Sequence, residues 1–529
     1  MGHLFNNWSV FIHKRKNKSG SVSILILKKV NGHNKVIYYL GTAKNEYELD
    51  YLLKVAEKKL IELRHGNQLS IFKNKTAEAQ LFGFFSRFLP HKPIRIGYYE
   101  IFGSTFDKLN LSSLIQEPIF KDLIISRIAK PNSKLATHRW LNDKLQRNIK
   151  KDEIYRFMDN INSSKQKMIN DHIYRYVRDY VKEEINIIFF DATTLHFETF
   201  DTDNFRKTGF SKVGKHNQPQ IVVGLMVTKE GLPLGYDVFP GNKWDGHTII
   251  DALRKVKSKA QTGRVVFVAD AGMCTSTNIK MIEKAGYEYI MADKLKNRSD
   301  EIKEQILNQN NYNIDNIFEM TIGSDHRLIS HYSQDRARKD RTDREKSIEK
   351  TRRRISRKDK ITKSVIKAPK YFELIGTSNL ILNRDKVRED EKWDGIKGYN
   401  TNISDLSAIK IISRYHDLWQ IEKAFRVSKQ DLGIRPIHHR KKERIQAHIF
   451  LVFLSLLVSI LTELELEKNG FKITTSMMLE QLDNVQEYIF EDSKTKEKFK
   501  FRPDLGDINK RIYETLNLSY HVGIQSPAD

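Results

Sequence analysis

The sequence predicts an α/β protein whose main domain is a mixed β-sheet flanked by helices. The chain has 529 residues, too many for one hydrophobic core, and 39% of them are hydrophobic, which is enough for folded domains. Between residues 185 and 293, apolar runs of strand length alternate with amphipathic helical patterns. We therefore expect a folded protein of several domains with one central sheet.

The charge balance indicates a polyanionic partner. The formal net charge is +25 at pH 7, and Lys and Arg bind nucleic acid by displacing the counterions of its phosphates. An anionic membrane surface is the alternative, but the most apolar run, residues 449–461, is too short to span a bilayer and fits a buried core helix. Cys274 is the only cysteine, which excludes an intramolecular disulfide or a multi-cysteine zinc site. We expect a cytoplasmic protein that binds DNA and no membrane.

Two regions precede the central sheet. Residues 1–90 contain short strands joined by Ser-Gly and Asn-Gly turns, followed by a helical stretch at 46–65. Residues 91–180 are basic and mostly helical, which suits the binding of a DNA end. A purely architectural helical subdomain explains this second region equally well.

Residues 181–293 predict the first part of a catalytic core. The expected elements are a strand at 185–195, a hairpin at 220–241, a helix at 247–259, a strand at 263–273, a helix at 275–286 and a strand at 287–293. This order of strands and helices is that of an RNase H-like fold. One element is missing from it, a late helix that carries an acid.

The missing helix follows an insertion. Residues 294–403 have the pattern of an α+β insertion domain with a densely charged helix. Residues 404–465 then complete the core with one long helix that Ser404 caps and Gly433 ends. Residues 466–529 form a C-terminal region.

One face of the long helix carries charged residues among apolar ones. At about 100° per residue, this face holds Ile411, Tyr415, Leu418, Glu422, Phe425 and Lys429. A buried carboxylate is costly unless a cation, a hydrogen-bond donor or a metal compensates it. From the helix alone, a buried ion pair is the simplest explanation of Glu422, and a catalytic or metal-ligating role is the alternative.

Two further acids change that balance. Asp191 and Asp270 each end the apolar run of a predicted strand, and the first and fourth strands of an RNase H-like sheet are neighbours. The late helix would bring Glu422 to them, and three carboxylates so close repel one another unless cations neutralise them. Mg²⁺, with Mn²⁺ as a substitute, suits such ligands, and two ions can activate a water or a 3′-hydroxyl for phosphodiester chemistry. We predict that Asp191, Asp270 and Glu422 are the catalytic and metal-binding residues.

Several segments between residues 120 and 457 carry a family resemblance. They are SRIAKPNSKLATHRWL, FFDATTLHFE, GFSKVGKHNQPQIVVGLMVTKEGLPLGYDVFPGNKWDGHT, VVFVADAGM, YEYIMADKLK, EKWDGIKGYNTN and YHDLWQIEKAFRVSKQDLGIRPIHHRKKERIQAHI. In these segments the chain resembles the DDE transposases of bacterial insertion sequences, of the insertion-sequence-4 type. The helix signature of that group is Tyr, two residues, Arg, three residues, Glu, six residues and Lys. Tyr415, Glu422 and Lys429 match it, whereas Leu418 stands at the position of the Arg.

The resemblance implies a set of DNA contacts. Tyr415 and Lys429 would bind the end of the mobile element, and Arg414 or Arg426 would replace the missing Arg. Lys212 belongs to a loop expected to face the site, although a turn role explains it equally well. Independently of the resemblance, Arg440 belongs to the basic stretch HHRKK just past the helix, which we expect to contact DNA rather than to bind zinc through its two His residues.

The predicted function is DNA transposition. The resemblance implies metal-dependent cleavage at terminal inverted repeats, cut-and-paste transfer to target DNA, and a homodimer that holds two ends. Two rival functions stay open: an RNase H-like nuclease without strand transfer, and a catalytically silent DNA-binding protein derived from a transposase.

Overall fold

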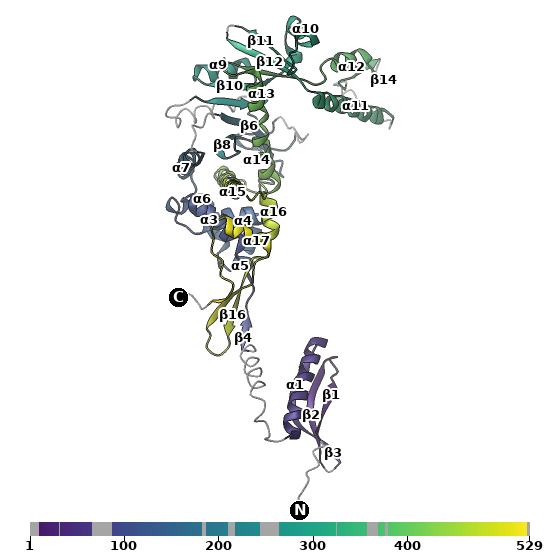
Figure 1. The fold of residues 1–529 in the computed structure, drawn as a ribbon, viewed down its shortest axis with the longest axis vertical. Helices are drawn as coiled ribbons and strands as arrows, with labels where there is room; N and C mark the ends of the chain where they lie inside the picture. The colour runs from purple at the N-terminus through teal and green to yellow at the C-terminus, as the bar shows by residue number, and fades with distance from the viewer. Residues whose placement is uncertain are drawn as a thin grey trace, which may run out of the picture. The chain divides into compact units, whose positions relative to one another are not determined.

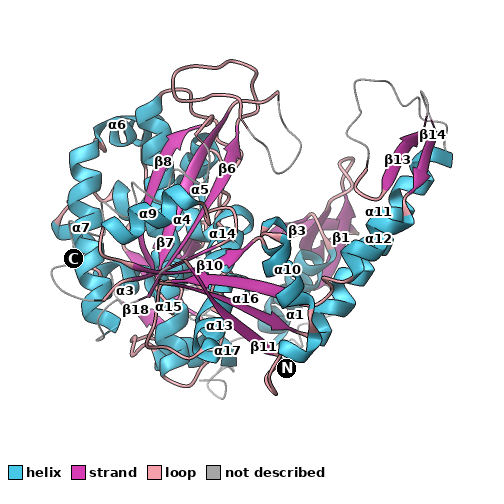
Figure 2. Cartoon of the chain, turned by 90° about the horizontal axis from the view of Figure 1, so that it is seen from above, coloured by secondary structure: helices cyan, strands magenta, loops and turns pink. Residues whose placement is uncertain are grey.

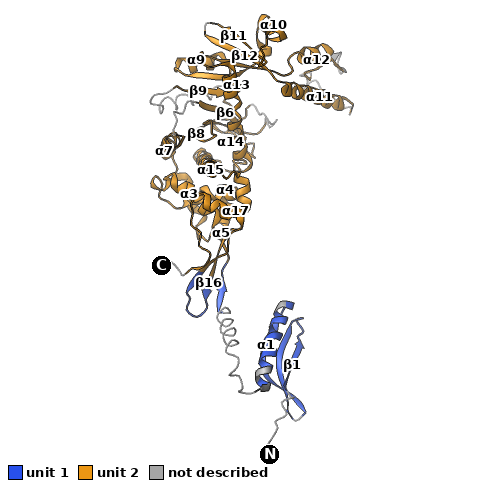
Figure 3. Ribbon diagram, in the orientation of Figure 1, with its two compact units in different colours: residues 1–91, 490–499, 527–529 blue, residues 92–489, 500–526 orange. Residues whose placement is uncertain are grey.

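The computed structural model describes residues 10–30, 32–65, 87–181, 187–209, 217–243, 264–323, 325–356, 369–375 and 379–525. Lys212 and the predicted helix at 247–259 lie outside the described residues. The chain divides into two compact units (Figure 3). One contains residues 1–91, 490–499 and 527–529, and the other contains residues 92–489 and 500–526.

The first unit contains a small antiparallel sheet and a helix (Figure 1). The strands pair in chain order and are β1 (Val10–Lys16), β2 (Val22–Val30) and β3 (His33–Ala43). Helix α1 (Glu46–His65) packs against all three strands. Ile24 and Ile26 of β2 and Ala56 of α1 are fully buried and form the centre of this module. The strands and the helix expected here are confirmed.

The second unit is built on an eight-stranded mixed sheet with the order β11-β12-β15-β10-β9-β6-β7-β8. Its strands are β6 (Ile187–His196), β7 (Gln220–Val227), β8 (Pro233–Pro240), β9 (Val266–Ala269), β10 (Glu288–Asp293), β11 (Ile317–Ile322), β12 (His326–Tyr332) and β15 (Ile396–Thr401). β6, β9 and β10 are parallel, whereas β7 is antiparallel to β6 and to β8. The part β8-β7-β6-β9-β10 has the strand order of an RNase H-like sheet, so the expected contact between the first and fourth strands is confirmed.

Helices cover this sheet (Figure 2). They include α7 (Ser163–Val181), α9 (Ser276–Lys284), α13 (Ala408–His416), α14 (Trp419–Gln430) and α15 (Lys442–Lys468). α7 and α15 pack against β8, α14 packs against β6 and β7, and α13 packs against β9 and β10. The parallel strands are therefore buried, and their burial explains why they are apolar almost throughout.

The late helix differs from the prediction, because two helices, α13 and α14, replace the single long one. Ser407, rather than Ser404, caps α13 by accepting the N–H of Lys410 at 3.4 Å. Between the helices, Leu418 N–H bonds to Tyr415 O at 3.0 Å and Gln420 N–H to Asp417 O at 3.0 Å. These bonds span three residues instead of four, and they tighten the chain at the junction. The expected end of the second helix is confirmed, since Gly433 has φ +54°.

Helix α15 is longer than the predicted apolar run. It contains 27 residues and packs against a group of N-terminal helices, α3 (Gly97–Lys108), α4 (Ile119–Ala129) and α6 (Lys151–Asn160). By length and composition it could cross a membrane, but 83% of its most apolar window is buried inside the protein. Helix α5 (Lys134–Leu145) joins the same helical group through α4 and α6.

The segment predicted as an insertion contributes directly to the main sheet. β11, β12 and β15 extend the sheet beyond β10. The other elements of this segment are α10 (Asp300–Leu307), α11 (Gln334–Ser356), α12 (Arg384–Glu391) and the paired strands β13 (Phe372–Ile375) and β14 (Asn379–Leu382). The buried Arg344 of α11 forms a two-pronged ion pair with Asp394, at 2.6 and 2.7 Å. The domain boundaries drawn from the sequence stay predictions.

The remaining elements are short and lie near residue 90 and after α15. They are β4 (Phe88–Pro90), β5 (Ile94–Arg95), α16 (Thr475–Leu482), β16 (Gln486–Asp492), β17 (Lys498–Arg502), α17 (Asp507–Thr515) and β18 (Gly523–Gln525).

Candidate active site

Asp191 and Asp270 lie at the same level on neighbouring parallel strands. The last residues that pair β6 with β9 are Phe189 and Val268, and each acid comes two residues later in its strand direction. A step of two residues returns a side chain to the same face of a sheet, and neighbouring strands lie about 4.8 Å apart. The register therefore places these two carboxylates side by side where the pairing of the two strands ends.

The structure corrects the expected position of Asp191. The sequence predicted that this acid ends its strand, but β6 continues to His196 because β7 pairs with it along that whole length. β9, which pairs with the other edge of β6, is the strand that does end here. Its last residue is Ala269, and Asp270 follows it. Each Asp holds one carboxylate oxygen in place by accepting the N–H of the next residue, Ala192 or Ala271, at 2.7 Å.

Glu422 lies in the first turn of α14 and is exposed. The expectation that its carboxylate is buried is wrong, and the reason is the phase of the helix. The buried residues of α14 are Ile421, Ala424, Phe425 and Ser428. Glu422 therefore lies at the margin of the buried stripe, where a carboxylate keeps access to solvent.

Tyr415 links the three acids electrostatically. Its ring is only 4% exposed. Burial first, and then the charges that include those of Asp270, Glu422 and Asp191, raise the pKa of its phenol. The phenol therefore stays protonated. The charges of all three predicted acids thus act on one side chain.

Lys397 is a residue of this site that the sequence did not reveal. It belongs to β15, and its Nζ lies 4.3 Å from the centre of the Tyr415 ring. Burial lowers the pKa of Lys397, whereas the charges of Asp270 and Glu422 raise it. Lys397 therefore interacts electrostatically with two of the acids. Its segment, EKWDGIKGYNTN, belonged to the family resemblance, but it was assigned to the insertion and not to the site.

Lys429 fixes α14 against β6. Its Nζ donates a hydrogen bond to Thr193 Oγ1 at 2.6 Å. Thr193 is two residues beyond Asp191 and shares its face of the sheet. The helix that carries Glu422 thus lies over the same face as Asp191, whereas the predicted contact between Lys429 and DNA stays a prediction.

The other predicted DNA contacts have different environments. Arg414 is half-buried, Arg426 is exposed, and Leu418 is buried at the junction of α13 and α14. Tyr415 packs edge-on against Tyr399, with ring centres 5.0 Å apart. Trp419, the first residue of α14, is 51% exposed. Arg440, also exposed, lines a separate basic cavity.

The acids suit a divalent metal by their chemistry, because carboxylate oxygens are the hard ligands that Mg²⁺ and Mn²⁺ prefer. Over the described parts of the chain, however, no three His, Cys, Asp or Glu side chains lie close enough together to hold one ion. The three acids therefore have the chemistry of metal ligands, but their carboxylates do not surround a single ion position in this structure.

Comparison with known families identifies the class of protein. The family model described as "Transposase DDE domain" matches residues 182–458, more than half of the chain, and this range contains all three acids. The chain therefore belongs to the transposase DDE domain family.

Comparisons with individual proteins are more distant. The chain is similar to a piggyBac transposase synaptic complex with hairpin DNA, with 9% identity and a TM-score of 0.39, over 73% of this chain and 76% of that chain. It is also similar to the Mos1 transposase paired-end complex with left transposon end, with 14% identity and a TM-score of 0.15, over 46% of this chain and 74% of that chain. A search of curated proteins found no match.

Proposed function

We propose that this protein is a DNA transposase that cuts DNA at the ends of a mobile element and joins the freed 3′-hydroxyl to target DNA. One observation carries the proposal. Asp191 and Asp270 are in register on neighbouring strands, and the charge of Glu422 acts on the same Tyr415 as theirs. All three acids lie within the residues that match the transposase family.

In the proposed mechanism, Asp191, Asp270 and Glu422 would hold divalent cations, with Mg²⁺ as the natural ion and Mn²⁺ as a substitute. Bound there, two such ions would supply the activation of a water or a 3′-hydroxyl and the stabilisation of the leaving oxygen. Lys397, on which the charges of Asp270 and Glu422 act, and Lys429, which bonds to Thr193 two residues from Asp191, provide positive charge that favours a phosphodiester there. The protonated Tyr415 hydroxyl orients groups around the acids by hydrogen bonding.

The proposal extends to partners. The net charge of +25 supports binding to DNA. The resemblance supports a bacterial insertion sequence of the insertion-sequence-4 type, terminal inverted repeats as the bound ends, cut-and-paste transfer and a homodimer on the DNA. The protein would then act in the cytoplasm, where it reaches the chromosome.

A cleavage assay tests the proposal. The wild-type protein is given DNA that carries the element's own ends with its flanks, in Mg²⁺, Mn²⁺ or EDTA. We expect nicking at the element boundary that requires metal and is lost in Glu422→Gln. Glu480→Gln, which changes an exposed acid on α16, is the matched control and keeps full activity.

Two outcomes favour the rivals. Metal-dependent cutting without joining to a target plasmid indicates a nuclease of the same fold. Tight binding of the ends without any cut in the wild type indicates a DNA-binding protein derived from a transposase.

A further inference from the structure

A basic cavity lies beyond the C-terminal end of α14, away from the first turn that holds Glu422. Its volume is about 630 Å³. Six Arg or Lys residues and three His residues line it, and none of the lining residues that the structure describes is Asp or Glu. Two distant segments meet there, since Arg127 donates to the carbonyl of Gly433, 306 residues further along the chain. Asp191, Asp270 and Glu422 are not among the residues that line this cavity.

Two of its cations are buried, and no carboxylate among the residues that the structure describes pairs with them. Arg127 and Lys134 are each 4% exposed. Arg127 donates to the carbonyls of Gly433 at 3.3 Å and Asn132 at 3.1 Å. Within the described ranges, no hydrogen bond or ion pair is found for the Lys134 ammonium. Burial first, and the charge of Arg127 second, lower the pKa of Lys134. Unpaired buried cations are costly, and a bound anion would offset that cost.

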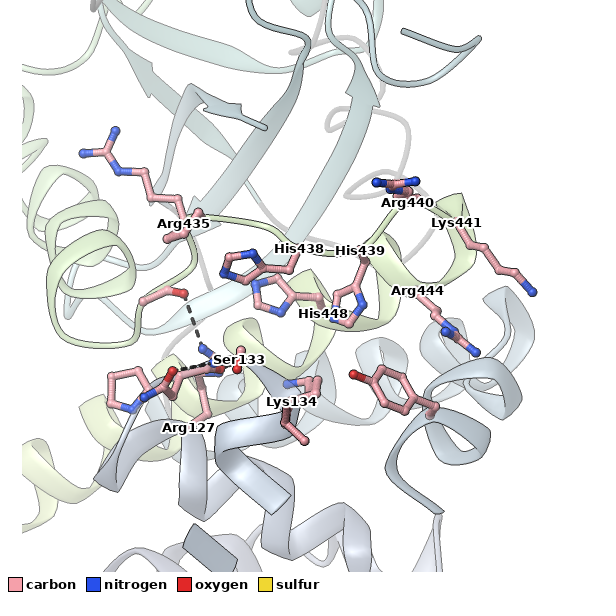
Figure 4. Close-up of a pocket in the computed structure, with 16 residues that line it drawn as sticks. Arg127, Ser133, Lys134, Arg435, His438, His439, Arg440, Lys441, Arg444 and His448 are labelled. Carbon is pink, nitrogen blue, oxygen red and sulfur yellow. Dashed lines mark hydrogen bonds between the residues drawn. The ribbon is translucent and has the colours of Figure 1, made fainter. Parts of the chain in front are cut away.

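The backbone adds to this positive potential. Lys134 is the first residue of the twelve-residue helix α5, and Ser133 caps it by accepting the N–H of Ala136 at 3.3 Å. The N-terminus of a helix carries a partial positive charge and unpaired N–H groups that attract anions. Figure 4 shows His438, His439 and His448 gathered opposite Lys134, on the other wall of the cavity.

One of the surrounding cations, Arg444, is paired with a carboxylate, whereas others lie exposed at the rim. Arg444 forms an ion pair with Asp159, at 2.6 and 2.7 Å. Arg435 and Arg440 are exposed at the rim, and Figure 4 shows Arg435 pointing outward. Buried charge in the interior with exposed charge at the rim suits a ligand that has one phosphate inside and further phosphates outside. A polynucleotide strand has this form, whereas a single carboxylate does not.

We propose that the cavity between Lys134 and His439 binds a backbone phosphate of a DNA strand, at a place separate from the acid site. The strand's identity as transposon DNA rests on the proposed function, but the phosphate site itself does not. Arg127 and Lys134 bind the phosphate inside, and Arg435 and Arg440 bind the neighbouring phosphates at the rim. The site anchors the DNA while the acids act on another part of it.

The test uses Lys134→Met in the full chain, because Met keeps the length of the side chain and removes its charge. Lys144→Met, which changes an exposed lysine in the last turn of the same helix, is the matched control. DNA affinity is measured across a salt series by fluorescence anisotropy, and thermal unfolding is measured with and without inorganic phosphate. For Lys134→Met we expect about a tenfold loss of DNA affinity and a salt slope lower by about one phosphate contact. Phosphate should stabilise the wild type and Lys144→Met but not Lys134→Met.

The possible outcomes separate the alternatives. If phosphate stabilises only proteins with Lys134 but DNA affinity is the same in all, the site takes a free phosphate or nucleotide, and the DNA assignment is overturned. If neither DNA affinity nor phosphate stabilisation depends on Lys134, the site itself is overturned. Arg435→Gln at the exposed rim gives the same comparison if Lys134→Met does not fold. Asp270→Asn, which should lose cutting and keep DNA binding, separates a failure of this site from a failure of the proposed catalysis.

Discussion

Replacing Asp270 by Asn distinguishes a catalytic acid from a structural one. Asp270 is exposed just past β9, and its Oδ1 accepts the N–H of Ala271 at 2.7 Å. The carboxamide oxygen of Asn can accept the same bond. The substitution therefore removes a charge and little else, so its effect on folding can be worked out from the neighbouring charges.

Two electrostatic effects of opposite sign determine that effect. Like charges about 5 Å apart, the separation expected for Asp191 and Asp270 in register, repel by about 0.8 kcal/mol in water and about 3 kcal/mol at an effective dielectric constant of 20. The attraction between Asp270 and Lys397 opposes this repulsion. We expect the free energy of unfolding of Asp270→Asn to stay within about 1 kcal/mol of wild type, because surface charge pairs contribute about that much. DNA cleavage should fall by at least about 100-fold, as expected when a group that stabilises the transition state is lost.

Urea unfolding and the cleavage assay are run on the same preparations, in EDTA and in Mg²⁺. A metal that binds the folded state stabilises it in proportion to the logarithm of its concentration. Mg²⁺ should therefore raise the unfolding midpoint of the wild type and not that of Asp270→Asn. A loss of more than about 2 kcal/mol in EDTA would show that Asp270 is structural. An equal Mg²⁺ effect in both proteins would show that it is not a ligand.

Three further predictions follow from the geometry. Lys429→Ala removes the bond to Thr193 and should weaken DNA-end binding most at low salt, with a salt slope lower by about one contact; an unchanged slope in anisotropy titrations counts against a phosphate role. Phe450→Ala empties a fully buried position of α15 that stacks on Phe120, and it should lower the free energy of unfolding in urea by about 3–5 kcal/mol; a change below about 1 kcal/mol would contradict a core helix. Burial first, and the charges of Lys134, Arg444 and Arg127 next, lower the pKa of His439 to about 4, so the unfolded chain binds the proton at a higher pH than the folded chain does. The free energy of unfolding should therefore fall as the pH drops from about 6.5 to about 4, by at most about 3 kcal/mol and less for a half-buried ring, and His439→Asn should flatten that part of the pH profile.

Much of the catalytic core could be predicted from the sequence, because its signals are local. Apolar runs such as residues 187–190 specify buried strands whatever surrounds them. Thr275 and Gly286 bound a helix by capping and by a positive φ, and the structure has that helix as α9. The order of such elements was enough to predict that β6 and β9 are neighbours and that Asp191 and Asp270 meet.

The remaining features depend on contacts that no local pattern specifies. Periodicity predicted an unbroken helix and a buried Glu422, yet the turn at Asp417–Leu418 divides the helix, and the packing of Ile421 and Phe425 leaves Glu422 at the margin. Lys397 joins the site only because its strand, β15, pairs with β10. The sequence pattern had placed Lys397 in the insertion, away from the acids.

The sequence by itself indicated most elements of the core and singled out three acids, because strand and helix propensities and apolar patterns act over a few residues. The tertiary structure alone decided which cations accompany those acids and where Arg127 and Lys134 meet the segment that follows α14. Pairings across some 300 residues depend on the packing of whole elements, and such packing leaves no periodic signal in the chain.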